Sequence, residues 1–153
     1  MTTSPFNLPP RRTGHPADAE LLQKRTGQAQ PIPGHAEAAS VARGRLEVGG
    51  AQHLTFTPPD ARGVILHFHG GGYRQGSPNF SAPFCSRVAA ATGATVAGVR
   101  YALAPEAPFP AGLHDAAAVY AHYARTGDEP IFLAGDSAGG GLAMALALSL
   151  IHI

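Results

Sequence analysis

The sequence predicts an α/β domain in which helices cover both faces of a mostly parallel sheet. Three short apolar runs have the length and composition of buried strands: Val64–Phe68, Thr95–Val99 and Ile131–Ala134. A segment of helical character follows each run: Ala82–Ala91, Leu113–Ala124 and Gly139–Leu148. Strands that alternate with helices in this way are typical of a parallel sheet.

The chain before these elements is less regular. Residues 1–15 are rich in Pro, Thr and Arg and have few apolar side chains, so we expect them to fray. A short helix is expected over Pro16–Arg25, with Leu21 and Leu22 on its apolar side. The glycine pair at positions 49 and 50 predicts a turn between two antiparallel strands: Arg45–Val48 and Gln52–Thr57.

Composition restricts the class of protein. A chain of 153 residues with 44% hydrophobic residues fits one globular domain. A net charge of +1, without runs of like charge, gives no reason to expect a nucleic-acid partner. The longest apolar run, Leu142–Ile151, is too short for a membrane span, and residues 1–12 lack the apolar core of a signal peptide. With Cys85 as the only cysteine, we expect a cytoplasmic protein.

The strongest functional motif is Gly135-Asp136-Ser137-Ala138-Gly139, a G-x-S-x-G string. It follows a predicted strand and opens a predicted helix, which is the setting of a nucleophile elbow. Such a turn raises a serine hydroxyl above the sheet, and its glycines avoid clashes in the crowded backbone. The motif therefore indicates Ser137 as a nucleophile, although a glycine-rich turn before an ordinary helix remains an alternative.

A second motif, His69-Gly70-Gly71-Gly72, ends the first predicted parallel strand. Consecutive glycines let a loop direct several backbone N–H groups at one point, as a developing oxyanion requires. A flexible linker is one alternative. A phosphate cradle is another, but the Tyr73-Arg74-Gln75 that follows supplies neither the Lys nor the Ser or Thr that a phosphate loop needs.

Other polar residues receive structural interpretations. His67 and His69 lie two apart on a strand and share a face, but no Cys, Asp or Glu cluster completes a metal site. We therefore expect no metal and no cofactor. Asp136 is interpreted as an elbow residue that binds nearby backbone and not as a triad acid.

Three blocks in order resemble the signature motifs of the hormone-sensitive-lipase-like esterases, which have the α/β-hydrolase fold: His69–Gly72, Tyr101–Ala111 and Gly135–Gly140. The resemblance implies that Ser137 is the nucleophile and that His69 orients the glycine loop by hydrogen bonding. It also implies three oxyanion-hole N–H groups, from Gly71, Gly72 and Ala138.

The middle block, with its three prolines, is expected to brace the loop after its strand. Glu106 is expected to make a buried hydrogen bond there. Asp115 is either a helix-start residue or a partner of this brace, and the first interpretation is favoured.

The resemblance also predicts the domain organisation. Residues 1–45 are expected to form a flexible amino terminus and part of a cap, and residues 46–147 the amino-terminal part of the hydrolase domain. In this fold the triad acid and histidine follow the serine along the chain. After Ser137 there is no Asp or Glu, and His152 lies fifteen positions on, or about 22 Å along a helix. We expect a chain truncated after the elbow helix and inactive by itself.

The last six residues, 148–153, resemble the translation of a sequencing adaptor. They are therefore expected to be a non-native tail. The alternative is a helix that happens to end in this sequence.

The expected function of the complete protein is serine-dependent hydrolysis of carboxylic esters, of the esterase or lipase type, through an acyl-enzyme. Its partner would be a small-molecule ester, and the sequence predicts no oligomeric state. An amide or peptide hydrolase is one alternative, because the elbow is shared. A ligand-binding receptor is another, since relatives such as plant gibberellin receptors resemble this layout but lack the catalytic histidine. A downstream Asp and His in the complete gene would favour the enzyme.

Overall fold

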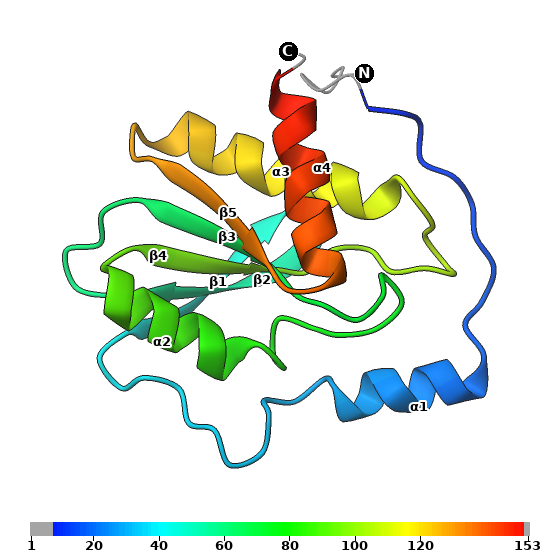
Figure 1. The fold of residues 1–153 in the computed structure, drawn as a ribbon, viewed down its shortest axis with the longest axis horizontal. Coiled ribbons are helices and arrows are strands. Elements are labelled where there is room, and N and C mark those ends of the chain that lie inside the picture. Colours follow the sequence, from blue (N-terminus) through cyan, green and yellow to red (C-terminus); the bar gives the residue numbers. More distant parts are fainter. Residues whose placement is uncertain (1–7, 152–153) are drawn as a thin grey trace.

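The computed structural model describes residues 8–151, which form one five-stranded sheet and four helices (Figure 1). In chain order the elements are α1 (Ala19–Gly27), β1 (Ala42–Val48), β2 (Ala51–Thr57), β3 (Val64–Phe68), α2 (Ala82–Thr92), β4 (Thr95–Val99), α3 (Ala111–Thr126), β5 (Ile131–Gly135) and α4 (Ala138–Ile151). The strand order across the sheet is β1-β2-β4-β3-β5.

The sheet is mixed. Its β4-β3-β5 part is parallel, whereas the β1-β2 hairpin joins β4 in antiparallel orientation. The predicted α/β class is confirmed, as are the bounds of β3 and β4. The prediction that β5 is buried is wrong, because β5 is an edge of the described sheet and Phe132 is 54% exposed.

Helices cover both faces of the sheet. On one face α2 packs over β2 and β4, and on the other α3 and α4 lie side by side (Figure 1). Side chains alternate along each strand, so one sheet supplies two cores. The α2 side contains Phe56, Cys85 and Val96. The α3–α4 side contains Phe68 and Leu146. Each of the Phe, Val and Leu side chains among them contributes about 1.5–3 kcal/mol when fully buried.

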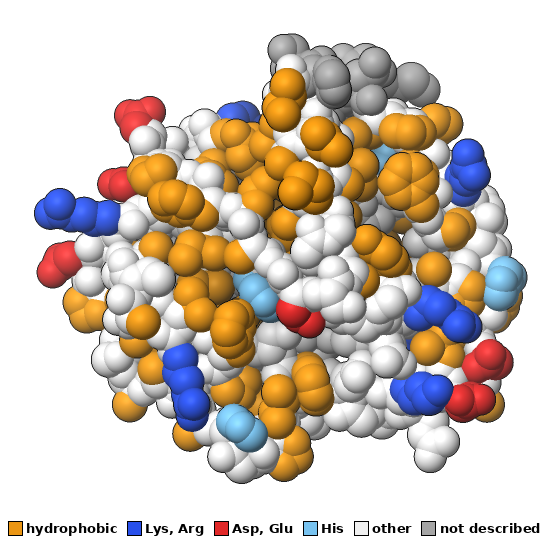
Figure 2. Space-filling model, viewed as in Figure 1, with side chains coloured by type: hydrophobic (Ala, Val, Ile, Leu, Met, Phe, Trp, Pro, Cys, Tyr) orange, Lys and Arg blue, Asp and Glu red, His pale blue; other side chains and the backbone are white. Residues whose placement is uncertain are grey.

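The helix α4 is apolar on its outer side as well. Leu142 and Leu146 pack into the core, whereas Met144, Leu148 and Ile151 are exposed. Figure 2 shows hydrophobic side chains gathered over this helix. None of the helices in the described part of the chain is long and apolar enough to cross a bilayer.

The first helix, α1, lies apart from the sheet and beside the loop that follows β3 (Figure 1). The side chain of Asp18 caps it by accepting a hydrogen bond from the N–H of Leu21 at 2.8 Å. The predicted helix started at Pro16, so the cap moves its beginning to Ala19. Of the two leucines expected on its apolar side, Leu21 is buried, but Leu22 is 50% exposed.

The division into residues 1–45, 46–147 and 148–153 stays a prediction. Its two outer parts reach positions 1–7 and 152–153, which lie outside the described residues. Within the tail, Leu150 packs against the core as part of α4.

Candidate active site

The two predicted motifs meet because their strands are parallel neighbours. Phe68, the last residue of β3, pairs with Gly135, the last residue of β5. The N–H of Asp136 then points at the carbonyl of Phe68, at 3.4 Å. The glycine loop and the G-x-S-x-G turn thus leave the same edge of the sheet, 66 positions apart in sequence (135 minus 69).

The turn between β5 and α4 is tight. Ser137 has φ 51°, a left-handed conformation that is strained for a residue with a side chain. A Cβ at Gly135 would overlap the carbonyl of Gly139, and a Cβ at Gly139 would overlap the carbonyl of Phe68. The predicted steric need for both glycines is therefore confirmed. Ser137 itself is exposed, and its hydroxyl makes no hydrogen bond within residues 8–151.

The glycine loop curls back on itself after β3. The carbonyl of Gly71 accepts hydrogen bonds from the N–H groups of Arg74 and Gln75, each at 3.1 Å. This turn requires φ 123° at Gly71 and φ 61° at Gly72. In the described part of the chain the N–H groups of Gly71 and Gly72 have no hydrogen-bond partner. The same holds for the N–H of Ala138, which begins α4.

The buried side chain of His69 supports this loop. Its Nδ1 donates to the carbonyl of Gly70 at 2.8 Å, and its ring stacks on Tyr101 at 4.4 Å between centroids. The Tyr101 hydroxyl donates to the carbonyl of His69 at 2.6 Å. Burial lowers the pKa of His69 to about 4, so the ring is neutral at pH 7. The neutral ring thus fixes the carbonyl of Gly70, at the start of the loop, by a hydrogen bond.

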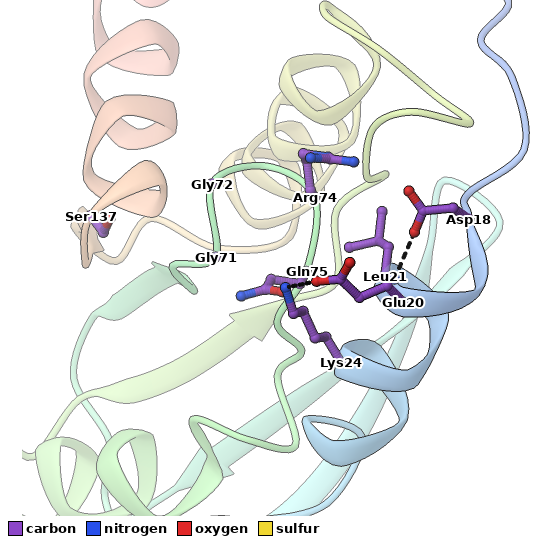
Figure 3. Close-up of a pocket in the computed structure, with 9 residues that line it drawn as sticks. All are labelled: Asp18, Glu20, Leu21, Lys24, Gly71, Gly72, Arg74, Gln75 and Ser137. Atoms are coloured by element: carbon purple, nitrogen blue, oxygen red, sulfur yellow. Dashed lines mark hydrogen bonds and ion pairs between the residues drawn. The ribbon is translucent and has the colours of Figure 1, made fainter.

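A cavity of about 400 Å³ separates the glycine loop from α1 (Figure 3). Ser137, Gly71 and Gly72 line it on one side, so the structure brings three of the predicted site residues together. Ala138 is not among its lining residues. The rest of the wall comes from the loop and from α1: Arg74, Gln75, Asp18, Glu20, Leu21 and Lys24.

A second hollow, of about 460 Å³, lies beyond the glycine loop and is mainly apolar. It shares Gly72 and Arg74 with the first cavity. Its apolar walls come from the loop, the 101–111 block and the helices: Tyr73, Phe109, Leu113, Leu142 and Ala145.

Asp136 does not make the backbone contact that was expected of its side chain. Its carboxylate is 66% exposed and lies 3.7 Å from Nε2 of His67, which is too long for a hydrogen bond. The elbow directs this side chain toward β3, where a Cβ at Gly70 would overlap it. Burial lowers the pKa of His67, and the charge of Asp136 opposes that shift. Among residues 8–151 no three His, Cys, Asp or Glu side chains are grouped to hold a metal.

The 101–111 block, which was expected to brace the loop after its own strand, is also tied to the end of the glycine loop. The N–H of Ala104 donates to the carbonyl of Tyr73 at 2.8 Å. Asp115 belongs to this brace, because its Oδ2 accepts from the N–H of Ala102 at 2.7 Å. The favoured interpretation of Asp115 as a helix-start residue is wrong, since α3 begins four residues earlier, at Ala111.

The expectation of a buried hydrogen bond at Glu106 is also wrong. Its side chain is 40% exposed and is paired with Arg25, at 2.6 Å from Nη1 and 2.9 Å from Nη2. Arg25 also donates from Nε to the carbonyl of Arg74 at 2.7 Å and from Nη2 to the carbonyl of Ala104 at 2.8 Å. Sequence reasoning missed these contacts, because they join positions 49 to 81 apart and no local pattern marks them.

Known proteins resemble this chain in sequence and structure. Residues 65–152 match the family described as the alpha/beta hydrolase fold. An acetyl-hydrolase of Streptomyces hygroscopicus is 43% identical over 89 residues, or 57% of this chain and 30% of that protein. Human hormone-sensitive lipase is 42% identical over 96 residues, or 59% of this chain and 9% of that protein.

Among solved structures, the protein EstE5, crystallised and soaked with p-nitrophenyl butyrate, superposes with a TM-score of 0.79 at 30% identity. The match covers 89% of this chain and 47% of EstE5. The chain thus spans less than half the length of each of these proteins. Since the family match takes in both motifs and more than half of the sequence, the chain belongs to the α/β-hydrolase fold family, and it resembles the hormone-sensitive-lipase-like members.

Proposed function

We propose that the protein containing this chain hydrolyses carboxylic esters through an acyl-enzyme at Ser137. The observation that carries the proposal is the strained turn at Ser137, which lines one cavity together with the glycine loop. Backbone strain at a solvent-accessible serine is a feature of nucleophile elbows. An ordinary helix start does not need a serine at φ 51°.

The chemistry follows from the groups around that cavity. The Ser137 hydroxyl attacks the ester carbonyl, and negative charge develops on the carbonyl oxygen. The unpartnered N–H groups of Gly71, Gly72 and Ala138 would stabilise that charge. Their fixed backbone positions mean that little reorganisation is needed as the charge forms.

A triad also requires a general base and an acid. We propose that both come from protein outside these 153 residues. The sequence has no Asp or Glu after Ser137, and the chain covers 47% of EstE5. The exposed apolar side of α4 supports the same idea, because surfaces of this kind usually contact further protein. The supplied histidine would take the hydroxyl proton and later return it to the leaving group.

The substrate is proposed to be a small ester with an apolar portion. An acetyl-hydrolase and a lipase are among the similar proteins. The apolar hollow beside Gly72 offers a place for an acyl or alcohol chain, while the cavity at Ser137 has a more polar wall. The triple-glycine loop favours esters over amides in this proposal.

The test is hydrolysis of p-nitrophenyl butyrate by the full-length protein. Ser137→Ala should reduce kcat by about 10⁶, the usual effect of removing a triad nucleophile. Ser40→Ala is the matched control, because Ser40 is exposed in a loop and its side chain makes no hydrogen bond in the described structure. A fluorophosphonate should label the wild-type protein at the peptide that carries Ser137.

A Ser137→Ala variant that kept a tenth of the activity would contradict the nucleophile. A protein that binds esters but neither turns them over nor accepts the label would instead be the receptor-like alternative.

A further inference from the structure

The side chain of Arg25 joins three segments that are distant in sequence. It reaches from the last turn of α1 to the glycine loop and to the 101–111 block. Four hydrogen bonds of 2.6–2.9 Å hold it, two to backbone carbonyls and two to the carboxylate of Glu106. The side chain is 19% exposed, which is low for an arginine.

One of those carbonyls belongs to the turn that carries the predicted oxyanion donors. The N–H of Arg74 closes the turn on Gly71, and the carbonyl of Arg74 accepts from Arg25. The other carbonyl belongs to Ala104, whose own N–H donates to the carbonyl of Tyr73. Arg25 therefore fixes both the end of the turn and the block that supports it.

Only an arginine can make this set of contacts. The guanidinium is planar and offers five donors in a rigid fork, which here serve three acceptor groups in different directions. A lysine would bring one compact charge and could not span both carbonyls and the carboxylate. Glu106 supplies the counter-charge, and Arg25 lowers the pKa of Glu106 to about 2, so the pair stays ionised at pH 7.

We propose that Arg25 is a positioning residue, which sets the direction of the N–H groups of Gly71 and Gly72 by clamping the carbonyls of Arg74 and Ala104. The consequence for catalysis rests on the proposed function. Because the clamp acts on the turn and not on the substrate, it should affect the transition state more than ground-state binding.

The variant Arg25→Met removes the clamp without detaching α1. A second anchor remains at the end of the helix, where the hydroxyl of Ser77 donates to the carbonyl of Gln28. Arg43→Met is the matched control, since Arg43 makes a comparable pair with Glu37 at 2.5 Å and also contacts Asn79, neither of which lines the cavity. Glu106→Gln keeps an acceptor but removes the charge.

The full-length protein is assayed with p-nitrophenyl butyrate, and hydrogen exchange is followed at residues 71–75. Arg25→Met should lower kcat about 10- to 100-fold with KM within about twofold, a part of the loss from deleting an oxyanion donor. Arg25→Lys should not restore kcat, whereas Glu106→Gln should stay within about threefold and Arg43→Met should match wild type. Exchange at residues 71–75 should accelerate in Arg25→Met and not in Arg43→Met.

Three results would overturn the proposal: an unchanged kcat in Arg25→Met, an equal loss in Glu106→Gln, or a raised KM with normal kcat. If the wild-type protein did not hydrolyse the ester, the proposed function would fail. The exchange measurement would still decide whether Arg25 holds the loop, and unchanged exchange would reject the clamp itself.

Discussion

The structure contains two glycine turns that look alike in sequence but require glycine for different physical reasons. The hairpin turn at Gly49 and Gly50 has φ 62° and 77°, and the glycine loop has positive φ at Gly71, Gly72 and Gly76. A Cβ at Gly50 would meet nothing within 4 Å, whereas a Cβ at Gly76 would overlap the carbonyl of Gly70. The hairpin needs glycine for its backbone angles alone. In the loop, Gly76 is also required because a side chain there would have no room.

A buried histidine supports each turn. His53 accepts from the N–H of Arg100 at 3.0 Å through Nδ1, which leaves the proton on Nε2 for the carbonyl of Val48 at 3.1 Å. His69 holds the carbonyl of Gly70 in the loop. Burial lowers the pKa of both rings, and that of His69 falls to about 4. Both turns thus depend on a neutral imidazole.

The largest effect is expected from Gly76→Ala. The new methyl group would overlap backbone at Gly70 and crowd the ring of His69, and neither can move without opening the loop. We expect a loss of about 4 kcal/mol in the free energy of unfolding, at the severe end for single substitutions. Urea denaturation measures it, and a Gly76→Ala protein of normal stability would show that the loop is softer than its packing indicates.

Gly72→Val separates backbone direction from packing within the loop. A Cβ at Gly72 would meet nothing within 4 Å, so the fold should survive, but φ 61° is a poor conformation for valine. The turn should relax and misdirect its N–H groups. We expect kcat to fall by about 10²–10³, equivalent to about 2.7–4 kcal/mol, in a protein with a cooperative melt. A folded variant at the wild-type rate would reassign Gly72 to a structural role.

Acidification tests the two neutral histidines together with His67, whose pKa is also lowered. Between pH 6.5 and about 4 the unfolded chain binds a proton that the folded protein refuses at His69, and the lowered pKa values of His53 and His67 act in the same direction. The free energy of unfolding should therefore be fully present above pH 6.5 and should decrease as pH falls. For each such proton the decrease is about 1.4 kcal/mol per pH unit. Thermal melts from pH 7.5 to 4 measure this slope, and greater stability at pH 5 than at pH 7 would refute it.

The smallest effect is expected from Gly50→Ala in the hairpin. The methyl group has room, so only the left-handed backbone opposes it, at about 1–2 kcal/mol. Gly50→Asn should cost less, because asparagine tolerates this conformation. Ester hydrolysis should be unchanged in both variants. Equal losses for alanine and asparagine would mean that something other than the backbone angle matters at this turn.

Sequence reasoning succeeded where the signal is local. The apolar runs predicted β3 and β4 with their observed bounds, and the glycines of the elbow were assigned the steric role that the backbone shows. It failed where a side chain acts across the fold. Glu106 and Asp115 were assigned by their neighbours in sequence, but their partners are Arg25, Arg11 and the backbone of Ala102. Only the folded chain brings these groups together.

The prediction that β5 is buried failed for a related reason. An apolar run such as Ile131–Ala134 predicts a strand, but its composition does not say where the strand lies across a sheet. The same limit applied to Leu22, because helical spacing alone does not reveal that α1 stands apart from the sheet.

The separate attachment of α1 has a practical meaning for enzyme engineering. Glu20 and Lys24 line the cavity opposite Ser137, and their side chains are 76% and 56% exposed (Figure 3). Among residues 8–151 they pair only with each other, at 2.7 Å. Such an exposed pair contributes little to stability. A library randomised at these two positions would vary this wall of the cavity, while the backbone that presents the serine stays fixed by β3 and β5.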